Sequence, residues 1–194
     1  MASEELYKKL SYTRAYRQTR LDVAQWVMDN PETFPDLLYF CFQKDEEISF
    51  RATWILEYVC LADLTLLPPY LDVFFEKLPS IYKDQSVRPL AKICEKLMIA
   101  YYKTKNETIL KEITETHKTT ITECCFDWLI TDQKVACQVY AMSTLYFLGI
   151  EYDWIHTELK IIIESNIHEG SAAYKARGRV TLEKIRKYQH SNKI

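Results

Sequence analysis

Apolar residues along this chain recur every three to four positions, in stretches separated by short polar or proline-containing breaks. This spacing places apolar side chains on one face of an α-helix. Strand-like alternation bounded by turn residues does not compete with it. The pattern predicts an all-α protein, with helices over residues 6–28 (a break near Ser11 is left open), 33–42, 46–61, 68–78, 84–101, 121–129, 135–148, 152–165 and 170–188.

A short fragment recurs with variation every 37 to 48 residues, as Phe50-Arg51, Val87-Arg88, Val135-Ala136 and Tyr174-Lys175. Each copy opens a helix that follows another predicted helix. Paired helices with a period of this length are typical of solenoids, in which each unit buries its apolar face against its neighbours. We therefore expect a right-handed α-α superhelix of about four to five helix pairs.

The helices are expected to form one domain over residues 1–194. Within it we predict an N-terminal capping helix over 1–30 and repeats over 33–190. The polar segment 103–118 lengthens one interval of the repeat and is interpreted as an insertion.

The predicted helix 135–148 is apolar nearly all round and ends at Gly149. A helix that is apolar on every side is usually buried on every side. We therefore expect it to be the most buried helix of the stack, with Val139 in the core.

The second helix of each pair resembles that of the HEAT and armadillo-like repeats. In that family it opens with an acidic residue, then an aliphatic-Arg pair, then a small residue. The stretch Asp84-Gln-Ser-Val87-Arg88-Pro-Leu-Ala91 is similar to this pattern, and Asp45 stands upstream of Phe50-Arg51. The resemblance implies a HEAT-like solenoid, and it implies that the acid and the Arg pair between successive repeats.

Composition narrows the class of protein further. Only three Gly occur in 194 residues, which disfavours phosphate-binding loops and β folds rich in tight turns. No apolar run reaches the roughly 18 residues of a membrane span, and the first residues do not form a secretory signal. The six cysteines fall mostly at apolar helix positions, so we interpret them as reduced core thiols of a cytoplasmic protein, with a disulfide framework as the alternative.

The sequence contains few residue patterns that are typical of catalytic, metal-binding or cofactor-binding sites. The four histidines lack zinc-ligand spacing, and no glycine-rich phosphate loop or nucleophile motif occurs. We therefore predict no metal and no cofactor, and we favour a non-catalytic function while leaving an enzymatic activity open.

The leading functional hypothesis is a helical-repeat scaffold that binds a protein or peptide partner on the concave face of the solenoid. The charged side chains of the second helices that are candidates for this role are Arg51, Arg88, Lys92, Glu95, Lys175, Arg179 and Arg186. For Arg51 and Arg88, pairing between repeats is the structural alternative. The identity of the partner and the oligomeric state are left open.

The alternative function is nucleic-acid binding, because alkylation-repair DNA glycosylases are also built from HEAT-like repeats. Against it, residues 21–170 carry 24 acidic and 13 basic side chains. Such a body repels DNA unless the basic residues gather on one face. Residues 171–194, by contrast, carry seven Lys or Arg and one Glu.

Overall fold

The computed structural model of the chain describes residues 3–13, 16–44 and 46–191, and for Glu46 the backbone alone. Asp45, the acid upstream of Phe50-Arg51, lies outside the described residues. Within these ranges the chain forms eleven helices and no strand: α1 (Glu4–Tyr12), α2 (Arg17–Asp29), α3 (Phe34–Cys41), α4 (Glu46–Ala62), α5 (Leu71–Lys77), α6 (Asp84–Met98), α7 (Glu107–Glu112), α8 (Glu115–Ile130), α9 (Val135–Leu148), α10 (Asp153–Asn166) and α11 (Ala172–Ser191). Short 3₁₀ turns (Pro31–Thr33, Leu64–Leu66, Pro68–Tyr70 and Leu78–Ser80) and one π-helical turn (Ile99–Lys103) complete the helical structure.

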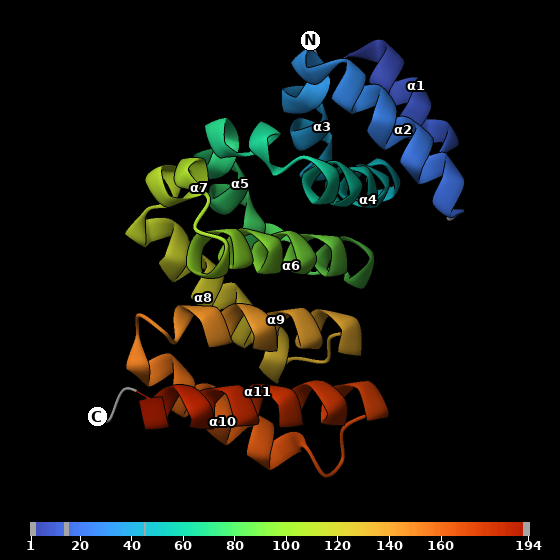
Figure 1. Cartoon of the computed structure of the whole chain (residues 1–194). Helices are drawn as coiled ribbons and strands as arrows, with labels where there is room; N and C mark the ends of the chain where they lie inside the picture. Colours follow the sequence, from blue (N-terminus) through green and yellow to red (C-terminus); the bar gives the residue numbers. More distant parts are fainter. Residues whose placement is uncertain (1–2, 14–15, 45, 192–194) are drawn as a thin grey trace.

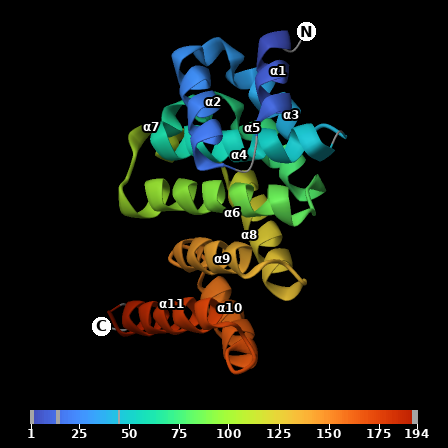
Figure 2. The same cartoon turned by 90° about the vertical axis from the view of Figure 1, so that its right-hand side faces the viewer.

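The helices stack in one direction from the N-terminal to the C-terminal end of the chain (Figures 1 and 2). α4, α6, α9 and α11 lie side by side in that order, and each packs against the next. Each of these is the second helix of a pair, and α1 with α2 forms a further pair at the N-terminal end. The expected all-α solenoid of four to five helix pairs is therefore confirmed.

The N-terminal part differs from the expected single capping helix over 1–30, because it contains two helices. α1 ends at Tyr12, where Thr13 takes an extended conformation and its hydroxyl donates to the carbonyl of Lys9. Leu6 and Leu10 of α1 are fully buried. The apolar residues of this segment are thus split between two short helices that cover the end of the stack.

The expectation for helix α9 is only partly correct. Its second half is buried, with Met142 and Leu145 fully enclosed, whereas Val139 in the first half is only partly buried. α6 and α4 bury as much of their length as α9 does. The side of α9 that carries Val139 is partly buried and lies between α6 and α11.

The polar segment 103–118 is more firmly attached than an insertion would be. It contains α7, whose Ile109 is buried, and its last residues form the first turn of α8. Lys118 is 3% exposed and its Nζ lies 2.9 Å from carboxylate oxygens of both Glu115 and Glu151. Burial opposes the charged form of Lys118, but hydrogen bonds to these two carboxylates outweigh it and raise the pKa of the ammonium.

All six cysteines are free and buried. Burial raises the pKa of Cys124 and of Cys137 to about 12, because the thiolate is poorly solvated in the core. These thiols are therefore chemically inert, in agreement with the interpretation as core residues.

We predict different outcomes for two aspartate substitutions in α9. Leu145→Asp should prevent folding, because an unpaired carboxylate in the core costs several kcal/mol, comparable to the whole stability of a domain. Val139→Asp should leave a folded protein with a smaller loss of stability, since the carboxylate can reach water. Circular dichroism melting of the two variants measures this difference, and equal losses would contradict the placement of Val139 on the partly buried side of α9.

We further predict that Lys118→Gln lowers the free energy of unfolding by about 2 kcal/mol, because it removes the hydrogen bonds of a buried ammonium to Glu115 and Glu151. The matched control is Lys111→Gln, which removes an exposed lysine from the same segment and should change stability by less than about 0.5 kcal/mol. Urea denaturation measures both. A Lys118→Gln variant as stable as the control would show that the ion pairs do not anchor the segment.

Candidate functional site

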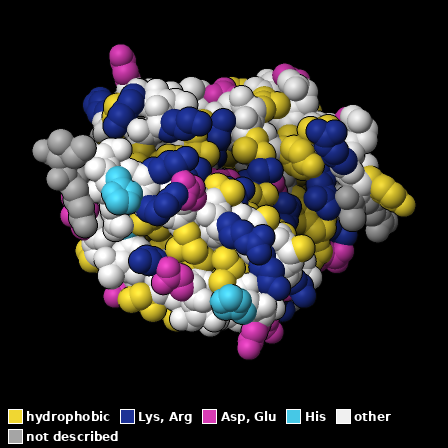
Figure 3. Space-filling view, turned by 60° about the horizontal axis from the view of Figure 1, so that its bottom comes forward, with side chains coloured by type: hydrophobic (Ala, Val, Ile, Leu, Met, Phe, Trp, Pro, Cys, Tyr) yellow, Lys and Arg dark blue, Asp and Glu magenta, His cyan; other side chains and the backbone are white. Residues whose placement is uncertain are grey.

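The second helices carry a continuous set of charged and aromatic contacts from one end of the stack to the other. We call this set of side chains the concave face; it consists of Arg20 from α2, Trp54 and Glu57 from α4, Arg88, Lys92 and Glu95 from α6, Tyr140 and Tyr146 from α9, and Arg177 and Lys184 from α11. Figure 3 shows Lys and Arg side chains gathered around a hollow of the molecular surface, with apolar side chains between them.

At the N-terminal end of this face, Arg20 lies over the ring of Trp54, with its guanidinium carbon 3.9 Å from the ring centroid. The Trp54 indole N–H donates to the carbonyl of Gln85 at the start of α6, which ties α4 to α6. The Nε of Arg20 is buried and has no hydrogen-bond partner among the described residues. Burial lowers the pKa of Arg20, and the neighbouring charge of Arg88 lowers it further.

The centre of the face is organised by Glu57. This carboxylate is only 5% exposed, and it accepts a hydrogen bond from Arg88, whose Nη2 lies 2.8 Å from Oε2. Lys92 Nζ lies 3.0 Å from the other carboxylate oxygen. Arg88 and Lys92 are four residues apart on α6, so they project from one side of that helix, toward α4. Two cations of one repeat therefore converge on one carboxylate of the preceding repeat.

Arg177 of α11 reaches Glu95 of α6, with 3.8 Å between Nη1 and Oε1. α9 lies between these two helices and packs against both. Helices that pack side by side in a flat layer are about 8–10 Å apart at each step. A contact between long side chains two helices apart is favoured where the layer curves inward, which agrees with a concave face at this point.

The C-terminal end of the face holds a surplus of positive charge. Lys184 Nζ lies 5.3 Å from the centroid of the Tyr146 ring. Its pKa is lowered, first by burial and then by repulsion from Arg177 and Lys103, while Glu95 opposes the shift. Arg177, Lys103 and Lys184 therefore lie near a single carboxylate, that of Glu95.

The structure divides the sequence-predicted candidates into three groups. Arg88, Lys92 and Glu95 belong to the set of side chains defined above as the concave face. Arg51 is 8% exposed and donates to the carbonyls of Leu10 and Ser11 at the end of α1, besides pairing with Glu47. It therefore holds the N-terminal pair in place and is not available to a partner.

Arg179 and Arg186 lie on the opposite side of α11, where they line a groove of about 380 Å³ against α10, and Arg186 pairs with Glu183. Lys175 is one helical turn before Arg179 and belongs to the same side by spacing. The prediction that these three residues join the row of Arg88 is thus wrong. The buried residues Tyr174, Gly178, Thr181 and Ile185 fix the rotation of α11, and they direct Arg177 and Lys184 toward the concave face instead.

The pairing between repeats that the resemblance implied is present at one of the two arginines. Arg88 binds Glu57 of the preceding repeat, whereas the motif acid Asp84 lies 3.8 Å from Lys134 of the following one. Arg51 instead binds backbone carbonyls.

The described residues contain neither a cluster that could bind a metal ion nor a single helix that could span a membrane. Within them, no three His, Cys, Asp or Glu side chains come together in a way that could hold a metal ion. No single helix there is long and apolar enough to cross a membrane; only the bent pair Glu47–Ala62 and Leu64–Ser80, with 112° between its halves, reaches the required length and composition.

Comparisons with known proteins agree with this architecture. Neither a curated protein sequence nor a solved structure matches the chain significantly. A family model described as a HEAT repeat domain matches residues 6–185, which is nearly the whole chain. The stacked helix pairs and this match together show that the chain belongs to the HEAT repeat family.

Proposed function

We propose that this protein is a non-catalytic helical-repeat scaffold that binds an acidic segment of a protein partner on its concave face. HEAT repeats stack helix pairs into extended surfaces, which suit recognition of another chain more than enclosure of a small substrate. A cytoplasmic location, where the buried thiols stay reduced, is part of this proposal.

The observation that carries the proposal is the imbalance of charge on the concave face. Its carboxylates, Glu57 and Glu95, are already paired with Arg88, Lys92 and Arg177. Arg20 and Lys184 have no carboxylate partner among the described residues, and Lys184 is repelled by its cationic neighbours. An acidic partner supplies the missing negative charge, and it relieves this repulsion on binding.

Tyrosine and tryptophan rings alternate with these cations. This arrangement favours a second candidate function, the binding of single-stranded nucleic acid. Trp54, Tyr140 and Tyr146 each lie under a cation, at 3.9, 6.0 and 5.3 Å respectively. Proteins that bind single-stranded nucleic acid combine cationic grooves with aromatic rings on which bases stack. The protein partner remains our leading proposal, because stacked helix pairs form an extended surface of the kind that recognises another chain.

The proposal predicts a salt-dependent affinity for a labelled peptide of ten glutamates that depends on the concave face. The double substitution Arg177→Gln and Lys184→Gln should weaken binding about tenfold, because each exposed charge pair contributes up to about 1 kcal/mol. Fluorescence anisotropy measures the dissociation constant.

The matched control removes two charges from the opposite side of the same helix, by Arg179→Gln and Arg186→Gln. This control should bind the peptide as the unmodified protein does. Equal weakening by both double variants would show unspecific attraction and overturn the proposed site. Tighter binding of a single-stranded DNA of ten nucleotides than of the peptide, at matched salt, would favour the second candidate.

A further inference from the structure

Arg20 of α2 carries a guanidinium group that lacks an acceptor. Its Nε is buried and has no hydrogen-bond partner among the described residues. The Trp54 ring lies under the guanidinium carbon, 3.9 Å away, and stabilises the charge. The ring does not accept the N–H groups, however, because they point outward in the plane of the guanidinium. A buried donor without an acceptor is costly, so this Nε points to a group from outside the chain that accepts from it.

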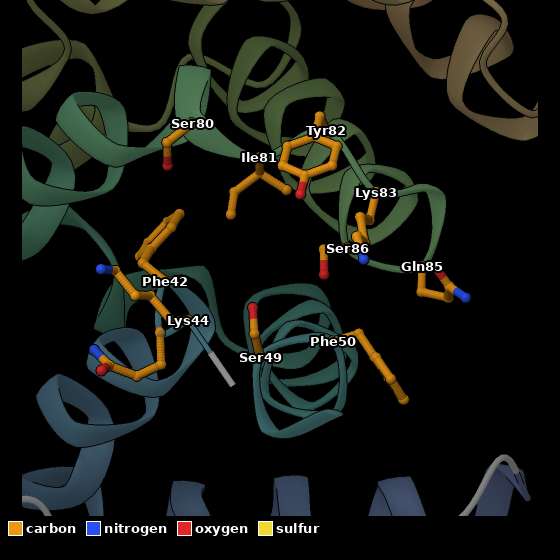
Figure 4. Close-up of a pocket in the computed structure, with 11 residues that line it drawn as sticks. Phe42, Lys44, Ser49, Phe50, Ser80, Ile81, Tyr82, Lys83, Gln85 and Ser86 are labelled. Carbon is orange, nitrogen blue, oxygen red and sulfur yellow. The ribbon is translucent and has the colours of Figure 1, made fainter. Parts of the chain in front are cut away.

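The Trp54 ring that carries Arg20 is held from two further sides. Phe50, one turn earlier on α4, packs against it with 4.8 Å between the ring centroids. The indole N–H donates to the carbonyl of Gln85 at the start of α6. Phe50 and Gln85 also line a cleft of about 470 Å³ between the first turns of α4 and α6 (Figure 4). The guanidinium of Arg20 therefore rests on a fixed ring, which lowers the conformational entropy lost when it binds an anion.

A second guanidinium, that of Arg88 on α6, lies near the first. Burial lowers the pKa of Arg20 most, and the positive charge of Arg88 lowers it further, while Tyr58 and Glu57 oppose the shift. The side chain of Arg88 is 32% exposed. Glu57 accepts from its Nη2 at 2.8 Å and from its Nη1 at 3.5 Å. A guanidinium has five N–H donors, so Arg88 keeps donors that Glu57 does not use.

The charges at this place favour a doubly charged anion. Arg20, Arg88 and Lys92 contribute three positive charges. Glu57 contributes one negative charge, which leaves two positive charges without a counterion. A carboxylate would neutralise one of them, whereas the phosphoryl group of a phosphorylated side chain carries a charge of about −2 and three acceptor oxygens. The planar fork of arginine also matches the geometry of phosphate oxygens.

We propose that Arg20 and Arg88 bind the phosphoryl group of a phosphorylated serine or threonine in the acidic partner segment. Arg20 donates from its unpaired Nε, and Arg88 donates from the N–H groups that Glu57 leaves unused. Lys92 adds a positive charge beside them. This inference deepens the proposed function and rests on it for the identity of the partner. The anion site itself rests on the unpaired Nε and on the two uncompensated charges.

The first test is a titration of ¹⁵N-labelled protein with N-acetyl-O-phospho-L-serine amide, followed by two-dimensional NMR. The Nε–H signal of Arg20 and the indole N–H signal of Trp54 should shift. Arg20→Gln should weaken this binding about tenfold, as expected for hydrogen bonds to a charged group. Arg179→Gln is the matched control, because it removes the same charge from the outer side of α11, and it should leave binding unchanged. Melting of both variants checks that they are folded.

Three further probes decide the chemistry of the ligand. N-acetyl-L-glutamate amide carries a single charge and should bind about tenfold more weakly than the phosphoserine probe. No response to the phosphoserine probe, or equal affinity for the glutamate probe, would overturn the proposal. Tighter binding of dimethyl phosphate would assign the site to a nucleic-acid backbone, and tighter binding of inorganic phosphate would assign it to the free ion. Either result would overturn the choice of a phosphorylated side chain.

A second peptide separates this inference from the proposed function. Phosphoserine in place of one central residue of the ten-glutamate peptide should tighten binding about tenfold. Arg20→Gln should abolish this difference, whereas the variant with Arg177→Gln and Lys184→Gln should weaken both peptides equally and preserve it. A difference that persists in Arg20→Gln would overturn this site and leave the proposed function intact. Binding of neither peptide, together with a response to the small phosphoserine probe, would overturn the proposed function and support the anion site.

Discussion

The packing of α4 against α6 and the charge of the proposed binding surface depend on one buried carboxylate, that of Glu57. A carboxylate that is 5% exposed must be paired, since an isolated ion in the interior costs far more than the protein's stability. Arg88 and Lys92 of the following repeat provide this pairing. The same contacts hold α4 against α6 and keep two long cationic side chains extended at the surface. The ion pairs of Glu57 therefore both stabilise the packing of two repeats and orient side chains of the proposed binding surface.

Along the rest of the stack the same principle recurs in weaker form. Glu95 receives Arg177 from two helices away, across α9. Each carboxylate is thus provided with cations from later repeats, and the surplus of cations grows toward the C-terminal end. This explains how a chain with a net charge of −2 carries a basic face. The acidic residues of the body are distributed elsewhere on the surface.

Helical periodicity and the repeated fragment were sufficient to predict the class of fold and most of the helices. The spacing of Val87, Leu90 and Ala91 also indicates which side of α6 is buried. For α11 the same reasoning failed, since its buried residues are Tyr174, Gly178, Thr181 and Ile185, of which two are not apolar enough to mark a core position. The rotation of α11 about its axis is therefore predicted incorrectly, so that Lys175 is expected at the place that Arg177 occupies.

Other features depend on contacts that a single sequence does not reveal. Gly149 was expected simply to end a helix. In the structure a Cβ at this position would lie 2.1 Å from the ring of His156, so the glycine is required for close packing of that ring. Similarly, nothing local to Lys118 indicates burial, because its partner Glu151 is 33 residues away.

In the proposed function, the carboxylate of Glu57 neutralises Arg88 and Lys92 from within the protein, and the acidic partner neutralises the remaining cations of the surface. The most direct measurement is therefore the melting temperature of Glu57→Gln, with and without the ten-glutamate peptide. Without peptide this variant should melt below the unmodified protein, because Arg88 and Lys92 lose their shared carboxylate. Addition of the peptide should then raise its melting temperature more than that of the unmodified protein, since the peptide replaces the missing charge. An unchanged melting temperature, or an equal effect of the peptide on both proteins, would contradict the central claim.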